Sequence, residues 1–125
     1  MPSLTKKILI IEDDSFISEL YAKKLSDIGY EVDLASDGKE GLEKVRSFKP
    51  DVVLLDIQMP IMNGYQVLQA MQKDKELKRI PVILLTNLGQ VEEVKKGRKL
   101  GAKSYLIKAH YTPAEIVEKI SEVLK

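Results

Sequence analysis

The chain alternates short apolar runs with longer amphipathic stretches from one end to the other. The apolar runs lie at residues 7–11, 30–34, 51–55, 81–85 and 104–107. Their length and their bounding turn residues are those of strands, and the stretches between them repeat apolar residues at helical spacing. Strands that alternate with helices favour a parallel sheet covered on both faces. We therefore predict an α/β fold, a doubly wound five-stranded parallel sheet with five helices.

Capping residues mark the predicted helix boundaries. Gly29 ends the first helix, Asp37 and Glu40 have capping-box spacing at the start of the second, and Gly101 closes the fourth. The fourth helix carries only a small apolar stripe, which predicts weak packing. The helical residues predicted to face the core are Ile17, Leu20, Tyr21, Leu25, Ile28, Leu42, Val45, Phe48, Val67, Leu68, Met71, Val91, Val94, Leu100, Ile116, Val117, Ile120 and Leu124.

Composition limits the classes of function. With 125 residues the chain has the length of one domain, and we expect residues 1–125 to form it without an attached output domain. The 20 basic and 19 acidic residues create no net field for nucleic acid or a membrane surface. There is no cysteine and no apolar run near the length of a membrane span. We therefore expect a cytoplasmic monomer that binds neither nucleic acid nor a membrane.

Acidic residues follow two of the predicted strands. Glu12 and Asp13 close the first strand and Asp56 closes the third. Asp14 or Ser15 can cap the following helix, and an acidic helix start is the simpler interpretation of the first group. Asp56, however, has no helix to cap nearby. If the two strands are neighbours, the acids converge at the sheet's ligand crevice, where their repulsion favours a bound Mg²⁺.

The fourth and fifth strands end in a hydroxyl and an ammonium group, Thr86 and Lys108. Each could be an ordinary strand-end residue. Together with a carboxylate and Mg²⁺ they supply the groups needed for phosphoryl transfer to Asp56, because cations offset the charge of the phosphoryl oxygens.

Four segments in order resemble the signature of the response regulator receiver domains of bacterial two-component systems. They are residues 8–14, 54–64, 81–86 and 101–108, so the resemblance spans essentially the whole chain. It implies a flavodoxin-like fold with strand order 2-1-3-4-5, like the chemotaxis receivers. It also implies a signalling domain that phosphorylates itself rather than an enzyme with turnover.

The resemblance assigns the chemistry to particular residues. Asp56 would accept a phosphoryl group from a histidine kinase or phosphotransfer protein. Asp13, Asp56 and the backbone carbonyl of Gln58 would ligate Mg²⁺, with Glu12 acting through water. Lys108 would contact the phosphoryl oxygens.

The resemblance also implies a switch. Thr86 would bond the phosphorylated Asp56, and Tyr105 would turn inward into the vacated space. The face formed by the fourth helix, fifth strand and fifth helix would then bind an output partner better.

Two positions depart from the usual pattern. Ala109 stands where proline usually follows Lys108, and a cis bond before a non-proline costs about 2.5–4 kcal/mol, so we expect a trans or a strained cis peptide. Leu88 has no polar group to position water, which predicts slow dephosphorylation. His110, the only histidine, is interpreted as a loop residue without the partners of a transition-metal site.

Three other functions share parts of this residue pattern. An aspartate-nucleophile phosphatase needs an acid two residues after the nucleophile, where this chain has Gln58. A flavin carrier of the same fold would have its phosphate repelled by Glu12, Asp13 and Asp14. A receiver-like interaction module that works without phosphorylation remains the alternative.

Overall fold

The sheet has five parallel strands in the order β2-β1-β3-β4-β5. The computed structural model describes residues 5–86 and 91–124, and for residues 91–93 and 109 the backbone only. The strands are β1 (Lys7–Ile11), β2 (Glu31–Ala35), β3 (Val52–Asp56), β4 (Val82–Thr86) and β5 (Ser104–Ile107). The predicted fold class and strand order are both confirmed.

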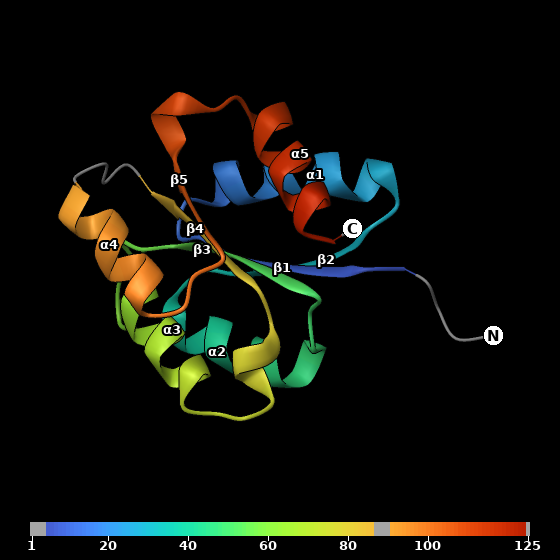
Figure 1. The fold of residues 1–125 in the computed structure, drawn as a ribbon. Coiled ribbons are helices and arrows are strands. Elements are labelled where there is room, and N and C mark those ends of the chain that lie inside the picture. Colours follow the sequence, from blue (N-terminus) through green and yellow to red (C-terminus); the bar gives the residue numbers. More distant parts are fainter. Residues whose placement is uncertain (1–4, 87–90, 125) are drawn as a thin grey trace.

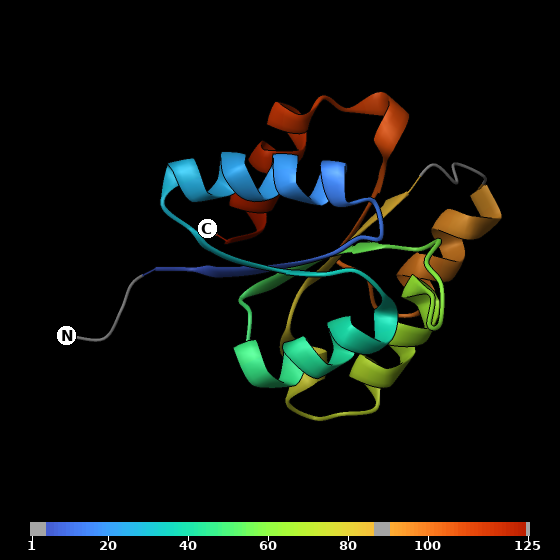
Figure 2. The same ribbon diagram turned by 180° about the vertical axis from the view of Figure 1, so that it is seen from behind.

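Helices cover both faces of this sheet. They are α1 (Ser15–Ile28), α2 (Gly38–Phe48), α3 (Gly64–Gln72), α4 (Val91–Lys99) and α5 (Pro113–Leu124). Helices α1 and α5 pack on one face, and α2, α3 and α4 lie on the other (Figure 1). The view from behind shows the same two layers (Figure 2). No helix in the described ranges is long and apolar enough to cross a membrane.

The core is divided by the sheet into two apolar clusters. Successive strand residues point to opposite faces, so Ile8 and Ile10 pack under α1 and α5, whereas Leu9 and Ile11 pack under α2 and α3. Every residue of β3 and β4 is buried, as expected of central strands covered on both sides. The strand ends are therefore fixed in position by the best-packed part of the molecule.

Some predicted boundaries differ from the structure. Strands β2, β3 and β4 begin and end one residue later than predicted, so Asp56 and Thr86 are the last strand residues rather than the first loop residues. Ile28 was expected in the core but is 57 % exposed. The buried stripe of α1 ends at Leu25, and Gly29, in a left-handed conformation, stops the helix directly after Ile28. The short 3₁₀ helices η1 (Leu77–Arg79) and η2 (Lys108–His110) were not predicted.

Helix α4 lies close to the sheet because it carries a glycine at the point of contact. A methyl group at Gly97 would stand 2.7 Å from Leu84 Cδ1 and 2.9 Å from Tyr105 Cδ2. Val94 and Leu100 are only partly buried, in agreement with the small apolar stripe. Val91, also expected in this stripe, has a side chain outside the described part. Contact with Tyr105 is thus a main feature of how α4 packs.

The loop between β3 and α3 holds one residue in a strained conformation. Ile61 has a φ of 69°, and the Met62 N–H donates to the Pro60 carbonyl at 2.7 Å, which closes a three-residue turn. A β-branched side chain is disfavoured in this left-handed region. The loop is clamped on both sides of the turn, because methyl groups at Gly38 and Gly64 would collide with the backbones of Met62 and Asp56. The packing around the loop therefore imposes the strain on Ile61.

The substitution Ile61→Asn is expected to raise the free energy of unfolding by about 1 kcal/mol, because asparagine tolerates the left-handed region. The Ile61 side chain is 77 % exposed, so little packing is lost. Urea unfolding measures the effect. Ile28→Asn, which replaces another exposed isoleucine in a helical conformation, is the matched control and is expected to give no gain. Equal effects of the two substitutions would contradict the assignment of strain.

Candidate functional site

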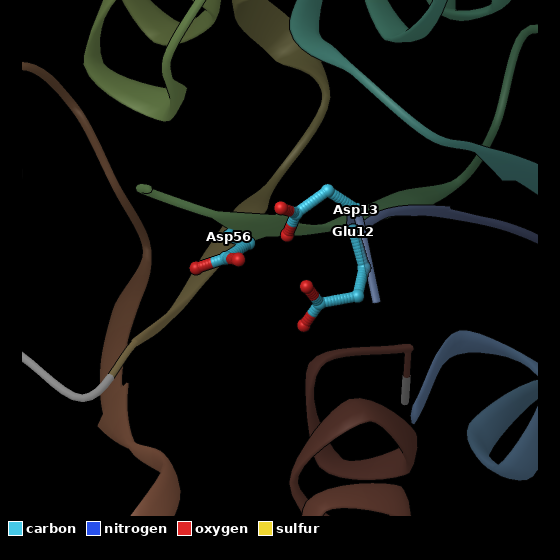
Figure 3. A group of neighbouring side chains, drawn as sticks. All are labelled: Glu12, Asp13 and Asp56. Atoms are coloured by element: carbon cyan, nitrogen blue, oxygen red, sulfur yellow. The ribbon is translucent and has the colours of Figure 1, made fainter. Parts of the chain in front are cut away.

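Three carboxylates meet at the carboxyl ends of β1 and β3. The two strands are hydrogen-bonded neighbours with Ile11 opposite Leu55, so the residues that follow them lie side by side. Oxygen atoms of Glu12, Asp13 and Asp56 all lie within 4.8 Å of one another. Figure 3 shows the three side chains gathered around one space. The convergence predicted from the strand ends is therefore present in the structure.

Lys108 joins two of these acids. Its Nζ donates to Glu12 Oε1 at 2.6 Å and lies 3.6 Å from Asp56 Oδ2. The Glu12 side chain is 3 % exposed and that of Lys108 is 17 % exposed, so the pair is largely shielded from water. The backbone N–H of Glu12 donates to the Ala35 carbonyl at 3.0 Å, which fixes the position of this residue at the end of β1. A cation that directly follows β5 thus offsets the charge of acids at the carboxyl ends of β1 and β3.

The three acids differ in their surroundings. Asp56 is 6 % exposed and its Oδ1 accepts a 3.4 Å hydrogen bond from the Gln58 N–H. Asp13 is exposed at the mouth of the site. Asp14 is turned away and caps α1, accepting hydrogen bonds from the N–H groups of Phe16 and Ile17. The helix-cap interpretation was therefore correct for Asp14, whereas Glu12 and Asp13 belong to the cluster.

Crowding of charge shifts the ionisation of the cluster. Burial, opposed by the hydrogen bond from Lys108 and reinforced by Asp56, raises the pKa of Glu12. Partial burial and the neighbouring Glu12 raise the pKa of Asp13. Burial would lower the pKa of Lys108, but its hydrogen bond to Glu12 and the charges of Asp56 and Glu12 outweigh burial and leave it raised. The site carries more negative charge than one ammonium group can neutralise.

The donor set fits a hard divalent cation. Carboxylate oxygens are the ligands that Mg²⁺ prefers, and three of them face one space here. The raised pKa values of Glu12 and Asp13 show that negative charge is unfavourable at this place without further positive charge. The Gln58 carbonyl, predicted as a further ligand, belongs to the residue whose N–H bonds Asp56. Its ligand role stays a prediction.

The predicted switch residues lie beside the cluster. Asp56 pairs with Leu85 across β3 and β4, so Thr86 stands one residue further along the neighbouring strand, fully buried. Tyr105 is half-buried on β5, opposite Leu84 and against Gly97. No peptide bond in the described ranges is cis, so the bond between Lys108 and Ala109 is trans. Leu88, predicted to slow dephosphorylation, lies outside the described residues.

A cleft of about 540 Å³ opens next to Asp13 and was not predicted. Its lining includes Gln58, Asn63, Tyr65 and Lys96. The Lys96 ammonium lies 4.3 Å from the centre of the Tyr65 ring, a cation–π contact that joins α4 to α3. These two residues are far apart in the sequence and belong to different helices, so no pattern in the chain could have paired them.

Comparisons with known proteins agree with this geometry. The family model described as "Response regulator receiver domain" matches residues 8–121. "Probable transcriptional regulator ycf27" of Guillardia theta is 42 % identical over 120 residues, which cover 96 % of this chain and 46 % of that protein. The chain spans about half the length of the curated relatives it matches.

Solved structures are similar over nearly the whole fold. The chemotaxis protein CheY4 of Vibrio cholerae has a TM-score of 0.88 at 30 % identity, covering 95 % of this chain and 98 % of that one. A CheY-like receiver domain protein from Methanospirillum hungatei has a TM-score of 0.88 at 32 % identity, covering 96 % and 94 %.

The charge crowding predicts a pH-dependent effect of Asp13→Asn in the presence of EDTA. Because the pKa of Asp13 is raised from 3.8, its contribution to stability is full below about pH 3.8 and is lost as the pH rises through the raised pKa. Asparagine suffers no such loss. The variant is therefore expected to gain up to about 1 kcal/mol over the wild type at pH 7, a small figure because solvent screens an exposed carboxylate.

Urea unfolding between pH 3.5 and 7 measures this difference, which is expected to shrink as the pH falls. Asp27→Asn is the matched control, since Asp27 is exposed on α1 and belongs to no acid cluster. A gain that is the same at all pH values would contradict the assigned cause.

Proposed function

The chain belongs to the response regulator receiver domain family, and from this premise we propose that Asp56 accepts a phosphoryl group in a Mg²⁺-dependent reaction. The observation that carries the proposal is the position of Asp56: buried, 3.6 Å from Lys108 Nζ, and in one cluster with Glu12 and Asp13. The donor is a histidine kinase or phosphotransfer protein.

The proposed transfer is a direct displacement at phosphorus. A carboxylate oxygen of Asp56 forms a bond to the phosphorus atom as the bond from phosphorus to the donor's imidazole nitrogen breaks. The imidazole leaves with the electron pair of that bond, and Asp56 becomes an acyl phosphate. Because the protein supplies both the acceptor and its surroundings, catalysis consists of positioning and charge stabilisation. The chain acts on itself and is not an enzyme with turnover.

Lys108 has a role on each side of this reaction. Before transfer its ammonium group lies between Glu12 and Asp56, where its positive charge offsets the repulsion between the two acids. After transfer the same group is within reach of the new phosphoryl oxygens and stabilises them by charge-assisted hydrogen bonds. Because the ammonium group of Lys108 already lies beside Asp56, only a small movement of this side chain is needed to bind the phosphoryl oxygens.

The metal would be held by Asp13, Asp56 and the Gln58 backbone carbonyl, with Glu12 acting through water. When bound, Mg²⁺ neutralises charge on the acids and on the phosphoryl oxygens. The exposed position of Asp13 leaves the site open on the side from which a donor must approach. The fit of the three carboxylates to a hard cation supports this assignment.

Labelling with acetyl phosphate tests the phosphoacceptor. The wild type is expected to gain one phosphoryl group by intact mass in Mg²⁺ and none in EDTA, and Asp56→Asn is expected to gain none because it lacks the nucleophile. Asp27→Asn, an exposed acid outside the cluster, is the matched control and should be labelled normally. Labelling of Asp56→Asn at the wild-type level would show that another residue is the acceptor, and absence of labelling of the wild type in Mg²⁺ would leave the phosphorylation-independent interaction module as the better description.

We further propose that phosphorylation is transmitted to α4 through Thr86 and Tyr105. The phosphoryl group adds acceptors beside Thr86, which lies one strand away from Asp56 and has no exposed surface. Movement of Thr86 toward the new group opens space near Tyr105, whose ring contacts α4 at Gly97. Because α4 is held by few apolar side chains, its position can respond.

The proposed output of this switch is partner binding on the face formed by α4, β5 and α5. A partner that prefers the phosphorylated arrangement shifts the population toward it by its difference in affinity between the two states. The half-buried Tyr105 connects this face to the site.

Amide hydrogen exchange of residues 91–99 tests the switch. Addition of Mg²⁺ and beryllofluoride is expected to change exchange in the wild type, because the mimic engages Thr86 and shifts α4. Thr86→Val removes the hydroxyl at nearly constant volume and is expected to abolish the change, whereas Thr86→Ser keeps the hydroxyl and should restore it. Acetyl phosphate labelling of each variant checks that Asp56 remains reactive. An exchange response that survives in Thr86→Val would refute the role of the hydroxyl.

A further inference from the structure

Five exposed basic side chains line two adjoining clefts at the rim of the sheet where β4 and β5 begin. They are Lys73, Lys78, Arg79, Lys99 and Lys103, and together they are called the basic rim below. They come from the end of α3, from η1, from the last turn of α4 and from the connection between α4 and β5 (Figure 1). The acid cluster lies at the opposite rim, where the strands end.

The clefts share walls and therefore form one continuous surface. Gly101 lines both clefts, which have volumes of about 380 and 520 Å³. The Lys103 N–H donates to the Val82 carbonyl at 2.8 Å, which ties the connection to the start of β4. Apolar side chains line the clefts between the charged groups: Ile80, Pro81, Leu100, Ala102 and Val123. The volumes are within the range of about 300–1,000 Å³ typical of ligand pockets.

The charge of the basic rim is not balanced within the molecule. Among the described residues, none of the five forms an ion pair. No acid of the described residues lines the two clefts, and the acids of the neighbouring loop, Asp74 and Glu76, line a different cleft. The chain has 20 basic and 19 acidic residues, so concentrating five cations here leaves the rest with more acids than bases. The molecule is thus electrically polar, with a cationic rim opposite an anionic one.

We propose that the basic rim docks an acidic protein segment in which carboxylates flank apolar side chains. Carboxylates match the five cations, and the apolar linings of the clefts accept the side chains between them. Nucleic acid would use the cations but not the apolar linings, because its backbone contacts are made by phosphates. A membrane surface is disfavoured because the exposed large hydrophobic side chains in the described part, Phe16, Ile28 and Ile61, lie elsewhere.

This surface goes beyond the proposed function and does not rest on it. The basic rim lies at the amino ends of the strands, whereas Asp56 is at a carboxyl end. Docking there is therefore expected to be constitutive and to leave the phosphoacceptor site open. The partner would anchor the domain irrespective of its phosphorylation state.

Fluorescence anisotropy with a short fluorescein-labelled peptide of alternating glutamate and leucine tests the proposal. Lys78→Glu/Lys103→Glu is expected to weaken peptide binding at least about tenfold, because two attractive contacts become repulsive. Lys24→Glu/Lys39→Glu makes the same change of net charge at exposed positions on α1 and α2 and is expected to change affinity less than about twofold. Affinity should be the same with and without Mg²⁺ and beryllofluoride.

Several outcomes would overturn the proposal. Equal weakening by both double variants would show attraction to net charge rather than docking at the rim. Equal binding of a peptide with glutamine in place of glutamate would remove the requirement for acid. Tighter binding of duplex DNA or of phosphatidylserine vesicles would assign the surface to another class of partner. Failure of Asp56 labelling would bear on the proposed function alone, since the two readouts use different rims.

Discussion

The repulsion between carboxylates brought together by backbone pairing is the constraint around which this molecule is organised. Hydrogen bonds between β1 and β3 place the acids at their carboxyl ends within 4.8 Å of one another, a distance at which the charged forms oppose each other. The fold holds this arrangement because the strands are buried on both faces and cannot shift register without exposing the core. Lys108 compensates part of the negative charge, and the remaining negative charge favours a bound cation. The site thus carries excess negative charge, and the packing of the whole sheet stabilises the strands that hold the acids in place.

The molecule has a rigid part, the central strands, and an adjustable part, α4. This difference underlies the proposed transmission of phosphorylation from Asp56 to α4. Asp56 and Thr86 end fully buried strands, whereas α4 contacts the sheet through a glycine and partly buried side chains. A structural change at these buried strand ends is therefore expected to displace α4 at a small cost in packing free energy. Strain is also localised beside the site: Ile61 is held in a left-handed conformation by the clamped loop that follows Asp56. The two surfaces proposed for partners have different relations to this site. In the proposed switch Tyr105 connects the α4–β5–α5 face to the site, whereas the basic rim lies at the other end of the strands.

Local sequence patterns were sufficient to predict most elements of the fold. Strand order and both apolar faces follow from the alternation of runs, from helix periodicity and from the family resemblance, and they are confirmed. Errors occurred at the ends of elements. Ile28 fits the helical period but lies in the last turn of α1, beyond the sheet, where periodicity no longer implies burial. The one-residue shift of β3 and β4 has the same origin, since a strand's end depends on the partner strand. The trans peptide before Ala109 agrees with the intrinsic cost of a cis bond.

Sequence alone determined the identities and the chain order of the groups that carry the chemistry: the acids after two apolar runs, Thr86 and Lys108 after two others. It could do so because strand and helix periods are local properties of the chain, and because parallel strands end at one rim. Only the tertiary structure decided which groups touch. That Lys108 pairs with Glu12 as well as Asp56, that Lys96 lies on Tyr65, and that five cations gather opposite the acids depend on distances across the fold. Such contacts join residues far apart in the chain, and their geometry is set by how the helices pack on the sheet rather than by any local pattern.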